Sequence, residues 1–131
     1  MHRHKKSLEQ FWKNFRKMFV KCKMVRISAF ISFVFIAITF VLPVWRILPM
    51  ASETPFIALH YNIYLGVDRF GPVHSLFVIP AMSLGFFLLN VFIQAHAYRR
   101  QKTLTYFFAA ATPVITFILM VAMTLIVLIN L

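Results

Sequence analysis

Three long apolar runs follow a basic N-terminal segment. Residues 27–45, 73–95 and 104–131 contain no Asp, Glu, Lys or Arg. An α-helix rises about 1.5 Å per residue, so each run can cross a hydrocarbon core about 30 Å thick. Three such runs in one short chain predict three transmembrane helices rather than the buried helices of a soluble domain.

A different periodicity precedes the first apolar run. From Ser7 to Lys23, apolar side chains recur at steps of three and four residues, which marks one face of a helix. Ser7 with Gln10 matches a capping box, a signature found at helix N-termini. A helix with one aromatic and one basic face is typical of those that lie in the headgroup plane, and a docking helix for a cytoplasmic partner or nucleic acid is the alternative. The cations expected to face anionic headgroups are Lys13, Arg16, Lys17, Lys21 and Lys23.

The composition also indicates a membrane protein. Of 131 residues, 61% are hydrophobic, 16 are Phe and only three are acidic, whereas soluble domains average about 45–50% apolar residues. A soluble domain of this size could not bury so much apolar surface. We therefore predict an all-α membrane protein with three transmembrane helices and a basic amphipathic N-terminal interfacial helix. The N-terminal helix takes residues 1–26, and the three-span membrane domain takes residues 27–131, with a structured outer loop at 46–72.

Lys and Arg are concentrated on alternate sides of the predicted spans. The first 26 residues hold nine of the 14, the 46–72 segment holds two, and the 96–103 segment holds three. Because positively charged flanks stay in the cytoplasm, we expect the N-terminus inside, and the 46–72 loop and the C-terminus outside, in the cytoplasmic (plasma) membrane. Cleavage of the first span as a signal peptide is the alternative, but its charged region is long and no A-x-A site follows. Next to apolar spans, the net charge of +11 favours anionic lipid over nucleic acid as a partner.

Each span carries polar residues at helical spacing, which places them on one helix face. Small and hydroxylated residues let helix backbones approach closely in lipid, and Asn or Gln can form hydrogen bonds between helices. We expect these residues to form the seam of a three-helix bundle, with a polar vestibule for a permeant as the alternative. No ionisable residue lies deep in a span, which argues against a proton relay or an ion pathway. The seam residues are Ser28, Ser32, Ser83, Asn90, Gln94, Thr105, Thr112 and Thr116.

The connection between the first two spans is too long for a simple turn, so we expect it to have structure of its own. Apolar residues at every second position from Ile57 to Leu65 favour an extended segment with one apolar face. Gly66 and Gly71 are expected to lie in turns, and Asn62 is expected to support one.

Several potential metal ligands occur around the same connection. They are His60, Asp68 and His74, with Glu53 as a fourth. Their spacing is not a recognised zinc pattern. We therefore expect no metal, and expect Asp68 to pair locally with Arg69 or Arg46 instead.

The stretch HYNIYLGVDRFG resembles the loop motif of the SdpI-type immunity proteins. That motif has His, an aromatic residue and Asn, then Gly, Asp, an aromatic residue and Gly, in the loop after the first membrane helix. The matching residues here are His60, Tyr61, Asn62, Gly66, Asp68, Phe70 and Gly71. Gly66 is one residue late, Ala58 stands where the family has Pro, and Pro72 replaces a basic residue. The short three-span form is similar to small bacterial membrane proteins, and the resemblance implies immunity to a peptide toxin.

The sequence contains no phosphate-binding glycine loop, nucleophile elbow or carboxylate pair, so we expect neither catalytic residues nor a cofactor. We expect a small integral membrane protein of binding or accessory type, immunity-like or sensor-like, whose outer loop meets a partner or ligand. Its expected partners are anionic lipid headgroups and either a membrane protein or further copies of this chain, without nucleic acid. The alternative is a small transporter or channel subunit formed by oligomerisation.

Overall fold

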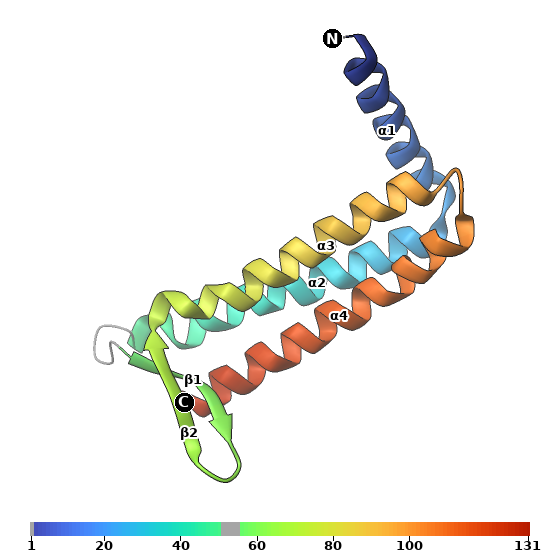
Figure 1. Ribbon diagram of the computed structural model, residues 1–131. Helices are drawn as coiled ribbons and strands as arrows, with labels where there is room; N and C mark the ends of the chain where they lie inside the picture. The colour runs from blue at the N-terminus through green and yellow to red at the C-terminus, as the bar shows by residue number, and fades with distance from the viewer. Residues whose placement is uncertain (1, 51–55) are drawn as a thin grey trace.

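The structure is a computed structural model that describes residues 2–50 and 56–131, with side chains from Glu9 onward. Its helices are α1 (His2–Lys21), α2 (Lys23–Arg46), α3 (Val78–Ala97) and α4 (Lys102–Ile129) (Figure 1). Two strands, β1 (Phe56–Asn62) and β2 (Gly66–Pro72), lie between α2 and α3 in the chain. Two short 3-10 helices, η1 (Leu48–Met50) and η2 (Val73–Phe77), flank them.

Helices α2, α3 and α4 run side by side as a three-helix bundle (Figure 1). Helix α4 packs against both neighbours, whereas α2 and α3 contact each other far less. Three spans, Lys23–Met50, Val73–Ala97 and Lys102–Ile129, are long and apolar enough to cross a membrane. The predicted helical membrane fold with three transmembrane helices is confirmed, and the chain is a multi-pass membrane protein.

The bundle exposes apolar side chains on its outer surface and buries small polar ones. Phe30 on α2, Phe92 on α3 and Phe107 on α4 are all exposed, whereas Ser32 and Thr116 are fully buried. A soluble protein distributes these residue types the other way round. Lipid chains are the solvent in which this arrangement is favourable.

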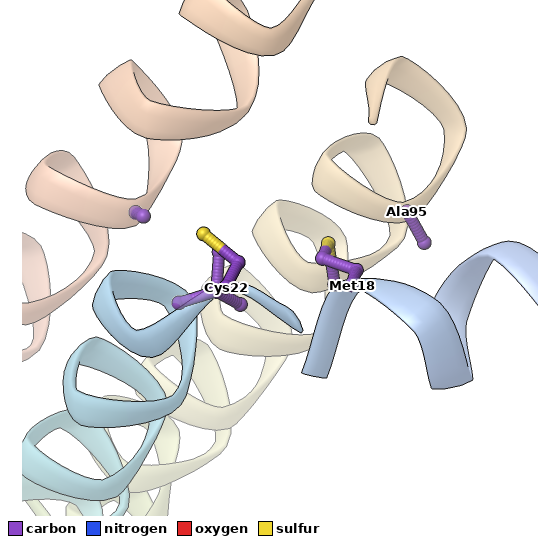
Figure 2. Packing of buried hydrophobic residues seen from close by; sticks show 5 residues of the cluster. Met18, Cys22 and Ala95 are labelled. Carbon is purple, nitrogen blue, oxygen red and sulfur yellow. The ribbon is translucent and has the colours of Figure 1, made fainter. Parts of the chain in front are cut away.

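Helix α1 meets the bundle at its own C-terminal end and extends away from it at a steep angle to the bundle axis (Figure 1). Cys22 separates α1 from α2, because its backbone is extended, with φ −103° and ψ 98°. Met18, Cys22 and Ala95 lie together where α1 meets α2 and α3 (Figure 2). They form one buried cluster with Val25 and Ala109, and this cluster holds α1 against the bundle.

The two ends of α1 differ from the expected ones. The capping-box match at Ser7 does not mark the start of the helix, because the backbone is already helical from His2. No Gly or Pro occurs between His2 and Lys21, so no residue type there opposes extension of the helix. At the other end, α1 stops at Lys21 and not at residue 26, because Lys23 and Arg26 already belong to the first turn of α2.

The connection between α2 and α3 folds into an antiparallel hairpin, which the sequence analysis does not predict. Its register runs from Phe56 opposite Pro72 to Asn62 opposite Gly66. The extended segment was expected, but its alternation is interrupted, because the register shifts on both sides of His60. Residues 63–65 leave the strand altogether and form the tip, so the expected apolar face does not continue through them.

Candidate functional site

The tip of the hairpin has the residue types that such a turn requires. The side-chain Oδ1 of Asn62 accepts a hydrogen bond from the backbone N–H of Tyr64 at 3.0 Å. Gly66 has φ +72°, in the left-handed region that glycine adopts without steric cost. A three-residue loop closed by a left-handed glycine is a common hairpin connection. The expected turn roles of Asn62 and Gly66 agree with these positions.

His60 and Asp68 face each other across the two strands. The imidazole Nδ1–H donates to Asp68 Oδ1 at 2.7 Å, since an ionised carboxylate can only accept. The expected pairing of Asp68 with Arg69 or Arg46 is wrong, because its partner is His60. The register places His60 opposite Arg69, the residue next to Asp68 in β2. Both side chains are substantially exposed, and exposed polar contacts of this kind contribute only about 0–1 kcal/mol.

Gly71 lies inside β2 and not in a turn, which corrects the expectation for this residue. It is buried opposite Ile57, and a Cβ at this position would collide with the side chain of Leu59. The side chain of Leu59 therefore packs directly over this glycine. Its motif neighbours Tyr61 and Phe70 are exposed on the hairpin surface.

A residue that the sequence analysis did not identify fixes the hairpin to the bundle. Asn130, which follows α4, accepts a hydrogen bond at Oδ1 from the Ala58 N–H at 2.8 Å. Its Nδ2 donates to the Ala58 carbonyl at 2.7 Å and to the Ile126 carbonyl at 2.8 Å. We call this set of bonds the Asn130 clasp. An Asn at the end of a helix offers no sequence signal for a partner 72 residues away.

Beneath the clasp, apolar side chains seat the hairpin on the bundle. Ile57 of β1 and Leu76 of η2 are buried in one cluster with Ile47, Met123 and Val127. The base of the hairpin is thus part of a hydrophobic core. The tip carries no such burial: Ile63, Tyr64 and Leu65 are 82%, 91% and 76% exposed.

All eight predicted seam residues are buried in the bundle. Thr112 is a shared acceptor, because Asn90 Nδ2 and Gln94 Nε2 of α3 donate to its Oγ1 at 3.2 and 3.4 Å. Thr112 Oγ1 itself donates to the Phe108 carbonyl at 2.6 Å. These bonds join α3 to α4 near the end of the bundle that carries α1.

Ser28 compensates for a proline in the neighbouring helix. Pro113 has no N–H, so it leaves the carbonyl of Ala109, one turn earlier in α4, without its helical donor. The hydroxyl of Ser28 on α2 donates to this carbonyl. Ala109 is small and fully buried, which lets the two helices approach closely enough for the bond.

Of the remaining seam residues, two form hydrogen bonds within one helical turn, and two have no hydrogen-bond partner among the described residues. Thr105 donates to the carbonyl of Gln101, the residue before α4, at 3.5 Å. Thr116 donates to the Thr112 carbonyl within α4 at 3.1 Å. The buried hydroxyls of Ser32 and Ser83 have no hydrogen-bond partner among the described residues.

The five predicted membrane-surface cations are all exposed, four on α1 and Lys23 at the start of α2. The opposite face of α1 carries the aromatic side chains, of which Phe11 lies against Phe92 of α3 with ring centroids 5.2 Å apart. Helix α1 is therefore amphipathic, with its aromatic face turned to the end of α3.

The potential metal ligands of the loop do not come together as a set among the described residues. His60 and Asp68 meet, but no group of three His, Cys, Asp or Glu side chains comes together there. Glu53 lies outside the described residues.

Comparisons with protein-family models, curated proteins and solved structures found no match. The resemblance to SdpI-type immunity proteins therefore stays a prediction from the loop residues.

Proposed function

We propose that the protein is a small integral membrane protein of binding type, without enzymatic activity, whose outer hairpin docks onto a partner protein. The observation that carries the proposal is the exposed apolar tip, Ile63 to Leu65, held on a hairpin that the Asn130 clasp fixes to the bundle. Large apolar side chains exposed together mark interaction sites. A tip held in one conformation also loses less entropy on binding than a flexible loop.

We infer the orientation from the charge distribution. The α1 end of the bundle is taken as cytoplasmic, because the first 26 residues hold nine of the 14 Lys and Arg. The hairpin and the end of α4 then lie outside the plasma membrane. Immunity to a peptide toxin, which the SdpI-type resemblance implies, and sensing are the two functions that suit an outward-facing hairpin of this kind.

Site-specific photocrosslinking tests the proposal. A photoreactive benzoylphenylalanine in place of Tyr64 is expected to give one discrete protein adduct in native membranes. The same substitution at Phe33, which is exposed on the lipid-facing surface of α2, is the matched control and is expected to give lipid adducts. Loss of the Tyr64 adduct in an Asn130→Ala background is expected, since the tip would no longer be held. Lipid adducts alone from Tyr64 would contradict the proposal.

One observation favours a second candidate, a small transporter or channel subunit formed by oligomerisation. Ser32 and Ser83 present buried hydroxyls without a partner among the described residues, and such groups suit a hydrated path. Asn90→Leu and Gln94→Leu distinguish the two functions. Loss of a measured solute flux with unchanged oligomeric state in mild detergent favours the pathway, whereas loss of assembly favours the seam.

A further inference from the structure

Cations converge in a groove beside α1. The groove has a volume of about 430 Å³ and is lined by Lys13, Arg16, Lys17 and Lys21 of α1 together with Arg99, which follows α3. We call it the basic groove. Its described lining residues include no Asp or Glu. Five like charges in one groove repel each other, so an anion that neutralises several of them would be bound strongly.

A second groove, of about 770 Å³, adjoins the first and has a different lining. Its apolar wall consists of Phe11, Trp12 and Phe92, and His96 and Arg100 line it as well. We call it the aromatic groove. It shares Gln10, Asn14 and Arg99 with the basic groove, so the two are continuous around these three side chains. Together they offer cations and an apolar surface to one ligand, which is the chemistry of an amphiphilic anion.

We propose that these two grooves bind one anionic phospholipid with two phosphate groups. The phosphates lie in the basic groove and one acyl chain covers the aromatic groove. Arg99 belongs to both grooves, and its guanidinium can bind a phosphate through two parallel hydrogen bonds. Basic pockets at the ends of transmembrane helices are typical sites for lipids with multiply charged headgroups. A free phosphate would leave the aromatic groove unused, and a lipid with one phosphate would leave most of the five cations unpaired.

This site is more specific than the attraction between a basic helix and an anionic membrane. Diffuse attraction depends on the number of charges and not on their positions. The proposed site depends on Arg99, which lies far from α1 in the sequence and reaches the groove only because Phe11, Met18 and their neighbours pack α1 against α3. It makes no use of the hairpin, so it stands or falls independently of the proposed function.

The test measures lipid affinity for the purified full-length chain in mild detergent. The probes are cardiolipin, which has two phosphates, phosphatidylglycerol at twice the molar concentration to match the charge, and sodium pyrophosphate. Arg99→Gln removes a cation from both grooves. Arg26→Gln is the control, because Arg26 is exposed at the same end of the bundle and lines neither groove.

We expect cardiolipin to bind more tightly than phosphatidylglycerol, and Arg99→Gln to weaken its binding about tenfold. Arg26→Gln is expected to change the affinity less than twofold, or about 0.4 kcal/mol, and pyrophosphate is expected not to displace the lipid. Equal losses in the two variants, equal affinity for the two lipids at matched charge, or displacement by pyrophosphate would each overturn the proposal. Circular dichroism of both variants checks that α1 and the bundle remain folded.

Discussion

Asn130 forms both backbone hydrogen bonds of Ala58, one to its N–H and one to its carbonyl. One side chain at the end of the last transmembrane helix thus substitutes for a neighbouring strand at the edge of β1. The same amide also donates to Ile126 of its own helix, which fixes its orientation. The position of the hairpin therefore depends on a residue 72 positions further along the chain.

Replacing Asn130 by Ala should release the hairpin from the bundle. Ala58 is buried, and a buried backbone group that loses its partner costs about 1–3 kcal/mol. We expect faster amide hydrogen exchange at Ala58 and faster proteolysis between residues 56 and 72, while the helices stay protected. Thr124→Ala is the control, because the Thr124 hydroxyl donates to the Met120 carbonyl of its own helix. Unchanged exchange at Ala58 in the Asn130 variant would show that the clasp is dispensable.

Gly66→Ala should destabilise the hairpin tip. A side chain in the left-handed region costs about 1–2 kcal/mol, and Gly66 has φ +72°. Gly85→Ala is the matched control: no neighbouring atom obstructs a Cβ there, and a helical Gly→Ala change stabilises by about 0.5–1 kcal/mol. The two substitutions should therefore shift the unfolding temperature in opposite directions. Stabilisation by both would contradict the turn described here.

Ser28→Ala should destabilise the bundle because it leaves the Ala109 carbonyl without a donor, at a cost of about 1–3 kcal/mol. The Pro113→Ala background restores the backbone N–H that α4 lacks at this position. Ser28→Ala is therefore expected to cost less in that background, and a double-mutant cycle in mild detergent measures the difference. Additive effects of the two changes would mean that Ser28 does not compensate for the proline.

Thr112→Val removes the acceptor shared by Asn90 and Gln94 while keeping the shape of the side chain. Hydrogen bonds between membrane helices contribute about 0.6–1.7 kcal/mol each. We expect the free energy of unfolding to fall by about 1–3 kcal/mol. Thr124→Val, which removes a bond within α4, is expected to cost less. Equal losses in the two variants would argue against the network.

Periodicity predicted the helices well because lipid makes a simple demand on sequence. A segment that crosses the hydrocarbon core must be apolar on its outside for its whole length, and the three uncharged runs show this directly. The polar seam residues could be identified for the same reason: Ser32 or Asn90 within an apolar run is unfavourable towards lipid and so faces another helix. Their buried positions agree with that expectation.

The hairpin and its attachments could not be predicted in the same way. Pairing between β1 and β2 depends on the left-handed turn at Gly66 and on close approach at Gly71, neither of which produces a periodic pattern. Alternation along the sequence predicted one continuous apolar face. The shift of register at His60 interrupts that face in the folded strand. The sequence favours Arg69 or Arg46 as the partner of Asp68 and not His60, because sequence distance says nothing about which residue lies across a strand. Contacts such as the one from Asn130 to Ala58 depend on where α4 ends relative to β1, which only the packed structure shows.

The central claim is that the hairpin and α1 lie on opposite sides of the membrane, and cysteine accessibility tests it most directly. In a Cys22→Ala background, Tyr64→Cys and Lys13→Cys each introduce one exposed thiol. A membrane-impermeant maleimide should label Tyr64→Cys in intact cells and Lys13→Cys only after permeabilisation. Labelling of Lys13→Cys in intact cells, or of both thiols only after permeabilisation, would contradict the account.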